Sequence, residues 1–174
     1  MNPGTLLPPH DRKWYAVYTA PQHESSVLKH LEIREVESFL PTYETVRIWK
    51  NRQKMKIALP LFPSYLFVRI SSRERKRVLE SPGVLQIVGN GREAAAIPSS
   101  EIELLRSGCS CGRAEAYSGV VLGQKVRIKR GPMEGVRGTL VSRSGGMKFV
   151  LSLELINQHA MIHVDSDWLE PVEG

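Results

Sequence analysis

The feature that most constrains this chain is an apolar segment that begins with two prolines. Pro60 and Pro63 lack a backbone N–H, so a central strand can begin only after them. Residues 65–70 are rich in aromatic and β-branched side chains, which predicts a buried strand. Because side chains alternate along a strand, Tyr65 and Phe67 share one face. The other face carries the aliphatic residues Leu66, Val68 and Ile70. Both faces are apolar, so each needs a cover from the chain itself or from a partner.

Positive charge is concentrated in two blocks of the sequence. The 174-residue chain carries a formal net charge of +6. Residues 45–77 hold ten Lys or Arg against one acid, and residues 123–148 hold seven against one. The residues from 149 to the end contain five acids and no Lys or Arg. The basic blocks favour a polyanionic partner, most simply nucleic acid; the alternative is solubilising surface charge.

Apolar periodicity predicts an α+β fold, with helices on an antiparallel sheet, before residue 107. Thr19-Ala20-Pro21-Gln22 has the form of a capping box, so we expect a helix from there to about Arg34. Two more helices are expected over 72–80 and 98–106. The expected strands are 13–19, 37–40, 43–49, 54–59, 65–70 and 84–88.

A change in composition predicts a second domain. Residues 108–119 are small, polar and without periodicity, which is typical of a linker. Five short strands follow, and such a set favours a small β-barrel because closure limits exposed edges. We therefore expect a flexible leader over 1–12, an α+β domain over 13–107, a linker over 108–119 and a barrel over 120–174.

No set of residues predicts catalysis. The phosphate-binding loop, the nucleophile elbow and the HExxH zinc motif are all missing from the sequence. His159 and His163 are four residues apart, but they lie in a β-patterned region without a third ligand nearby. Cys109 and Cys111 lack a second Cys/His pair at zinc spacing, so spare thiols in the linker are expected. We expect a protein that is not an enzyme and that holds no metal and no cofactor.

The cellular compartment is also suggested by the sequence. Two cysteines one residue apart cannot link distant parts of the chain, which fits a reducing environment. No segment reaches the roughly 18 consecutive apolar residues of a membrane span, and the first residues lack the apolar run of a signal peptide. We expect a cytoplasmic protein.

Two groups of residues are candidates for nucleic-acid binding. One is a cluster of cations in the second helix that would neutralise phosphates: Arg73, Arg75, Lys76 and Arg77. The other is His30 with Arg34, which are four apart and therefore neighbours on the first helix. The alternative is a solvated helix face, which is the commoner role for a residue like His30 and explains the cation cluster nearly as well.

Four strings in the first domain resemble, in order and spacing, the N-terminal (NGN) domain of NusG-type transcription elongation factors. They are Trp14-Tyr15-Ala16-Val17-Tyr18, Phe39-Leu40-Pro41, Pro60-Leu61-Phe62-Pro63-Ser64-Tyr65-Leu66-Phe67-Val68 and Pro82-Gly83-Val84. In the second domain, Gly123-Gln124-Lys125-Val126-Arg127-Ile128, Gly131-Pro132 and Gly135-Val136-Arg137-Gly138 resemble the KOW motif of the same family. The resemblance covers roughly residues 13–172 and implies an SH3-like barrel for the second domain.

Two details look closer to the specialised members of this family (the RfaH, LoaP and UpxY types). Ser64 stands where the housekeeping protein usually has glycine. Leu153-Glu154-Leu155-Ile156-Asn157 is similar to the last-domain strand of RfaH. RfaH's last domain can also fold as a helical hairpin, but the Val, Ile and Gly content of 120–141 favours a stable barrel here.

The resemblance implies a site on each domain. Aromatic residues of the N-terminal sheet would dock on the clamp helices of the largest RNA polymerase subunit, through Leu61, Phe62, Pro63, Tyr65 and Phe67. His30 matches a residue with which RfaH reads the non-template DNA strand. The barrel would tether ribosomal protein S-ten or Rho, with Met133, Ile156 and Asn157 as candidate contacts.

The function implied is binding rather than catalysis. A factor that bridges the polymerase clamp favours its closed, elongating state and suppresses pausing or termination. The protein would act as a monomer. The alternative is a stand-alone RNA- or ribosome-binding protein, because KOW barrels also occur in ribosomal proteins.

Overall fold

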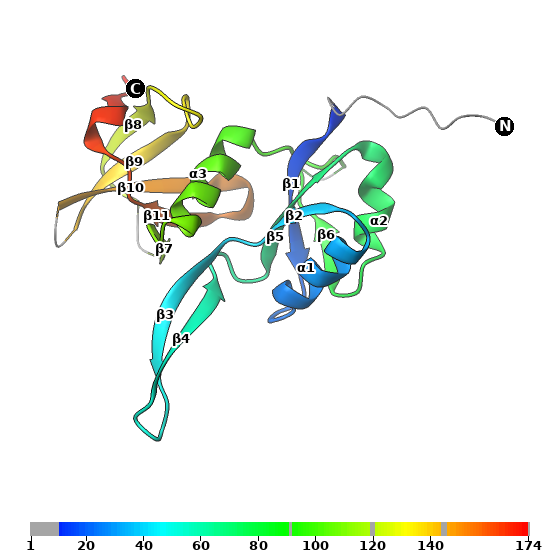
Figure 1. The fold of residues 1–174 in the computed structure, drawn as a ribbon. Coiled ribbons are helices and arrows are strands. Elements are labelled where there is room, and N and C mark those ends of the chain that lie inside the picture. Colours follow the sequence, from blue (N-terminus) through cyan, green and yellow to red (C-terminus); the bar gives the residue numbers. More distant parts are fainter. Residues whose placement is uncertain (1–10, 91, 119–120, 144–145, 174) are drawn as a thin grey trace.

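The computed structural model describes residues 11–90, 92–118, 121–143 and 146–173. A four-stranded sheet with two covering helices forms the N-terminal part, and a six-stranded sheet forms the C-terminal part (Figure 1). A long hairpin projects from the N-terminal part, and helix α3 (Ser99–Ser110) lies between the two parts (Figure 1). No helix in these ranges is long and apolar enough to cross a membrane.

The N-terminal sheet is antiparallel and has the order β2-β5-β1-β6. Its strands are β1 (Lys13–Thr19), β2 (Glu37–Phe39), β5 (Tyr65–Ile70) and β6 (Val84–Ile87). The apolar strand expected over 65–70 is therefore confirmed as β5, and it lies between β1 and β2. In the register, Phe67 lies opposite Ala16 of β1 and Phe39 of β2.

The aliphatic face of β5 packs under two helices, as the alternation predicts. Val27 and Leu31 of α1 (Glu24–Ile33) and Val78 of α2 (Arg75–Leu79) are completely buried against it. A one-turn 3-10 helix, η2 (Ser72–Glu74), leads into α2. This face therefore needs no partner.

The start of α1 differs from the predicted capping box. Thr19 is buried as the last residue of β1, and its hydroxyl donates to the carbonyl oxygen of Ala20 instead of capping the helix. Gln22 has a φ of 63°, so the backbone turns once more before α1 begins at Glu24. The capping-box spacing was therefore misleading because Thr19 is needed in the sheet.

The hairpin consists of β3 (Thr42–Ile48) and β4 (Lys54–Pro60), which pair along their whole length. Its root is held to the body by a hydrogen bond from the Leu61 N–H to the Pro41 carbonyl oxygen, at 2.8 Å. From that root it extends away from both sheets (Figure 1).

The segment expected to be a linker, 108–119, contains regular structure over most of its described length. Helix α3 continues to Ser110, four residues beyond its expected end, and Cys109 therefore lies half-buried in a helix. After three residues the chain forms strand β7 (Ala114–Tyr117), which pairs with β11 (Gln158–Ile162) of the C-terminal sheet. The short polar residues of this segment carry no periodicity that predicts regular structure. Strand β7 in particular forms because it pairs with the distant strand β11.

The C-terminal strands form an antiparallel sheet in the order β12-β8-β9-β10-β11-β7, which curves into a small barrel (Figure 1). The strands not yet bounded are β8 (Gln124–Ile128), β9 (Arg137–Arg143), β10 (Gly146–Leu153) and β12 (Leu169–Pro171), with 3-10 turns η3 (Glu154–Ile156) and η4 (Ser166–Trp168). Gly138 lets β9 approach the ring of Phe149, because a Cβ built at that glycine would lie 2.3 Å from the Phe149 Cζ.

Candidate functional site

The second apolar face of the N-terminal sheet is aromatic. Strand pairing places Phe67 beside Phe39, with ring centroids 6.3 Å apart, and Tyr65 beside Tyr18, with centroids 5.3 Å apart. Trp14 lies on the same face of β1 and is 3% exposed. We call Trp14, Tyr18, Phe39, Tyr65 and Phe67 the aromatic face.

Helix α3 covers one part of this face. The Cζ atom of Arg106 lies 5.4 Å from the ring centroid of Trp14 and 5.2 Å from that of Phe39. Ile102 and Leu105 of the same helix are fully buried in the core that contains Trp14. Helix α3 is thus attached both by apolar burial and by a guanidinium stacked on two rings.

The barrel completes the cover. Phe149, Leu153 and Ile156 belong to the same continuous apolar core as Phe67 and Trp14. The two sheets therefore share one hydrophobic core across α3, and the aromatic face is not free in this structure.

The residues expected to dock on polymerase differ in their exposure. Leu61, Phe62 and Phe67 are at most 1% exposed, whereas Tyr65 is half-buried and Pro63 is exposed. The ring of Phe62 meets that of Phe67 edge to face, with centroids 6.1 Å apart. Leu61, Phe62 and Phe67 lie in one apolar core with Tyr65 packed against it, and the contact of these residues with polymerase stays a prediction.

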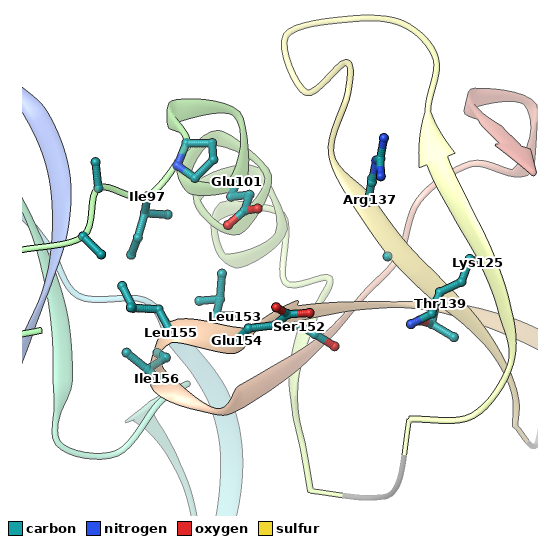
Figure 2. Close-up of a pocket in the computed structure, with 14 residues that line it drawn as sticks. Ile97, Glu101, Lys125, Arg137, Thr139, Ser152, Leu153, Glu154, Leu155 and Ile156 are labelled. Carbon is teal, nitrogen blue, oxygen red and sulfur yellow. The ribbon is translucent and has the colours of Figure 1, made fainter. Parts of the chain in front are cut away.

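A cavity of about 410 Å³ lies at the junction of α3 and the barrel (Figure 2). Glu101 projects into it from α3, on the side of the strand that carries Ser152 and of the turn that carries Glu154 (Figure 2). Lys125 and Arg137 line its far side. Burial, and next the nearby carboxylate of Glu154, raise the pKa of Glu101 above its ordinary value of 4.5.

The other flank of α3 is also packed. Met133, a predicted contact for a second partner, lies half-buried in a pocket with Leu104 of α3 and Trp168 of the barrel. Burial raises the pKa of the Cys109 thiol. A hydrogen bond with the backbone of Thr42, at the root of the hairpin, lowers the pKa by a smaller amount. Helix α3 therefore contacts the sheet, the hairpin root and the barrel.

The other predicted barrel contacts are divided between surface and interior. Ile156 is 5% exposed and lines the junction cavity, so it faces the N-terminal part of the chain. Asn157 is exposed and has a φ of 50°, the left-handed conformation that ends η3. Only Asn157 of the three candidate contacts is free on the surface.

The candidate nucleic-acid residues lie around the end of α1 and along η2 and α2. A side-chain nitrogen of Arg77 donates to the carbonyl oxygen of Arg34 at 3.4 Å, so the structure brings the two groups together. His30 and Arg75 are half-buried, whereas Arg73, Lys76 and Arg77 are exposed. Lys76 lies 3.7 Å from Glu80 on the same helix, and exposed pairs of this kind contribute little.

No cluster of metal ligands is found among the described residues. Nowhere in them do three or more His, Cys, Asp or Glu side chains gather as metal ligands would. His159 instead shares a hydrogen bond with the hydroxyl of Ser152, with 2.9 Å between Nδ1 and Oγ.

Comparison with known proteins decides the family. The family model described as "Transcription termination factor nusG" matches residues 12–106, which is more than half of the chain. The chain belongs to the NusG family. NusG-family proteins of this kind are transcription termination/antitermination factors, and the NusG resemblance stated from the sequence is thus confirmed.

Curated NusG proteins match most of the chain. The "Transcription termination/antitermination protein NusG" of Thermus thermophilus is 27% identical and covers 74% of this chain and 80% of its own length. The protein of the same name from Borreliella burgdorferi is 20% identical, over 92% of this chain and 99% of its own. Both of these relatives carry the general NusG name, so the specialised RfaH, LoaP or UpxY type stays a prediction.

A solved structure shows the same fold. The structure entitled "Domain interaction in Thermotoga maritima NusG" has a TM-score of 0.55 with 20% sequence identity, and covers 95% of this chain and all of that one. The α+β sheet followed by a small barrel is therefore the fold of a known NusG, as expected.

Sequence reasoning missed two residues of α3: Arg106, which covers part of the aromatic face, and Glu101, which lines the junction cavity. Arg106 and Glu101 carry no motif, and the family model ends at residue 106, before α3 does. No sequence pattern indicated their roles, because the buried apolar stripe of α3 is enough to predict the helix and both residues lie outside that stripe.

Proposed function

We propose that this NusG-family protein is a transcription elongation and antitermination factor whose aromatic face docks on the clamp helices of the largest RNA polymerase subunit. One observation carries the proposal: α1 and α2 pack on the sheet's aliphatic face, while α3 and the barrel pack on its aromatic face. Helix α3 and the barrel follow β6, the last strand of the four-stranded sheet, in the chain, so they can move away without unfolding that sheet.

Docking on this face requires that α3 and the barrel first be displaced. A binding-competent state that is populated only in part weakens the apparent affinity by that fraction. Polymerase would thus compete with the barrel for the same apolar surface. The factor would be held inactive until polymerase or another ligand shifts the balance.

The other parts of the surface would then take their own partners. The cations around α2 and the end of α1 would contact the non-template DNA strand beside the docked enzyme. The released barrel would expose Met133 and Ile156, which are covered here, to a second partner such as ribosomal protein S-ten or Rho. We assign this activity to the cytoplasm and to the specialised branch of the family, on the strength of Ser64 and the 153–157 string.

The test is capture of purified core polymerase by the full-length protein. Tyr65→Ala removes a half-buried ring of the aromatic face, and we expect it to lower capture several-fold. Tyr15→Ala, a half-buried tyrosine on the opposite face of β1, is the matched control and should leave capture near the wild-type level. Phe67→Ala is unsuitable because truncating a fully buried Phe typically costs about 3–5 kcal/mol of folding stability.

A third variant tests the competition. Leu155 is half-buried at the junction of the two parts, and Leu155→Asp should loosen the cover and raise capture. Equal capture by wild type, Tyr65→Ala and Leu155→Asp would refute docking through this face. RNA binding without any polymerase capture would favour the stand-alone RNA- or ribosome-binding protein instead.

A further inference from the structure

The β3–β4 hairpin has a surface that none of the contacts above uses. Nine large apolar residues are exposed in the described part of the chain, and four of them lie on this hairpin: Val46, Ile48, Trp49 and Met55. Ile48 is 68% exposed and Trp49 is 60% exposed. The hairpin projects from the body, and its outer half touches neither sheet (Figure 1). An exposed apolar cluster of this kind marks an interaction site.

The same hairpin is strongly basic. Its cations are Arg47, Lys50, Arg52, Lys54 and Lys56, against the single acid Glu44. None of the five forms an ion pair within the described part of the chain. The charge therefore favours a polyanion over an apolar protein surface or a membrane interior.

The cations lie on both faces of the ribbon. Val46 pairs with Lys56 and Ile48 with Lys54 on one face, and Arg47 pairs with Met55 on the other. Each face thus combines a cation with an apolar side chain. A ribbon of this kind can contact phosphates on both of its faces at once. The two walls of a groove in a double-stranded nucleic acid offer phosphates in that arrangement.

The tip is ordered by its own hydrogen bonds. The Trp49 N–H donates to the Gln53 carbonyl oxygen at 3.0 Å, and the Arg52 N–H donates to the Trp49 carbonyl oxygen at 2.8 Å. The Asn51 side chain donates to the side-chain oxygen of Gln53 at 3.0 Å. The backbone of the tip is therefore ordered before binding, which lowers the entropy lost when it meets a partner.

We propose that the β3–β4 hairpin inserts into the major groove of double-helical DNA. Two strands lie about 4.8 Å apart, and with side chains they fit the groove's width of about 12 Å, which admits a two-stranded ribbon. The cations would contact the phosphates of both walls, and the apolar residues would meet sugar and thymine methyl groups. The major groove of A-form RNA is too deep and narrow for such side chains, and a single strand offers no second wall.

This inference goes beyond docking on polymerase and does not depend on it. The hairpin is distinct from the aromatic face and from the cations of α1 and α2. The experiment therefore omits polymerase, so that failure of one proposal leaves the other standing.

The test measures binding of full-length protein to a labelled 20-bp DNA duplex, the corresponding single strand and an RNA duplex of the same sequence, by fluorescence anisotropy across a salt series. We expect the DNA duplex to bind about 10-fold or more tightly than either alternative. Lys50→Ala/Arg52→Ala should weaken duplex binding about 10-fold or more at ~0.1 M salt, and should reduce the salt slope by about 1.8, as the loss of two phosphate contacts predicts.

The matched control is Arg92→Ala/Arg113→Ala, which removes the same charge from two exposed arginines outside both basic blocks. Arg73→Ala/Lys76→Ala separates the hairpin from α2. In a second readout, duplex should quench the tryptophan emission of the wild type, and Trp49→Phe, with Trp14 and Trp168 still present, should remove most of that change. All substitutions are at exposed positions, and thermal unfolding monitored by circular dichroism verifies that each variant is folded.

Three results would overturn the inference. The hairpin variant could bind duplex with the same affinity and salt slope as the control. The single strand or the RNA duplex could bind more tightly than the DNA duplex, which would change the occupant. The α2 variant could abolish duplex binding while the hairpin variant retains it.

Discussion

Arg106 and Trp14 connect the two parts of the molecule: the guanidinium carbon lies 5.4 Å from the indole centroid. Arg106 belongs to α3, and Trp14 belongs to the central strand of the N-terminal sheet. The stem of the arginine adds apolar contact, and the charged head stays near solvent. This pair therefore holds the cover on the aromatic face without burying a charge.

Arg106→Ala should loosen that cover. The loss of a cation stacked at a partly exposed site should lower the free energy of unfolding by about 0.5–1 kcal/mol. Urea unfolding followed by tryptophan emission measures the change, and Arg92→Ala is the exposed control. If α3 is part of the cover, polymerase capture should rise in Arg106→Ala; unchanged stability and capture would contradict its role.

Glu101→Gln should stabilise the junction at neutral pH. The pKa of Glu101 is raised in the folded protein by burial and by Glu154, so the folded state binds its proton more readily than the unfolded chain does. This residue's contribution is therefore most favourable at low pH and is lost as pH rises from its ordinary value of 4.5 through the raised pKa. Glutamine has no charge and should abolish that fall.

The measurement is thermal unfolding of both proteins across the mildly acidic range. The difference between Glu101→Gln and wild type should widen as pH increases. Glu103→Gln, at an exposed position on the same helix, is the control and should run parallel to the wild type. A constant difference at every pH would contradict the raised pKa of Glu101.

Gly138→Ala should destabilise the barrel. The new methyl group would lie 2.3 Å from the Phe149 Cζ, and the 1%-exposed ring has little room to move. Overpacking of this kind typically costs about 1–3 kcal/mol, measured by urea unfolding. Phe149→Leu in the same protein should recover part of that loss, so the double variant should lose less unfolding free energy than the two single variants together.

Ser64→Gly should stabilise the protein. Ser64 has a φ of 67°, a conformation that disfavours side chains but suits glycine. The hydrogen bond from its N–H to the Glu24 Oε1, at 2.7 Å, uses the backbone and survives the change. We expect a gain of about 0.5–1 kcal/mol in unfolding free energy, and no gain for the control Ser64→Ala. A lower midpoint in Ser64→Gly would contradict the strain.

The strands of the N-terminal sheet could be predicted because each one has its own run of apolar and β-branched residues. Residues 13–19 and 65–70 became β1 and β5 with the expected bounds, and their alternation assigned each face. Thr19 is a case in which a local pattern predicts the wrong structure. Its side chain suits a helix cap, but pairing of β1 with β5 and β6 buries it in the sheet. A local preference was overridden by a tertiary one.

The arrangement of α3 and β7 was beyond such reasoning. Ala114–Tyr117 has little strand propensity and is ordered by pairing with residues more than 40 positions away. The aromatic face could be predicted as a surface that needs a cover. That Arg106 and the barrel supply the cover depends on packing between elements that no spacing in the sequence records.

Strand β7 limits how this molecule can open. It occupies the edge of β11, and if the barrel left it behind, a row of unpaired backbone groups on β11 would be free to join the strands of other molecules. An opening that avoids aggregation must keep β7 on the barrel. The pivot then falls before α3, near Pro98, so the helix and the barrel would swing away from the aromatic face as a single arm.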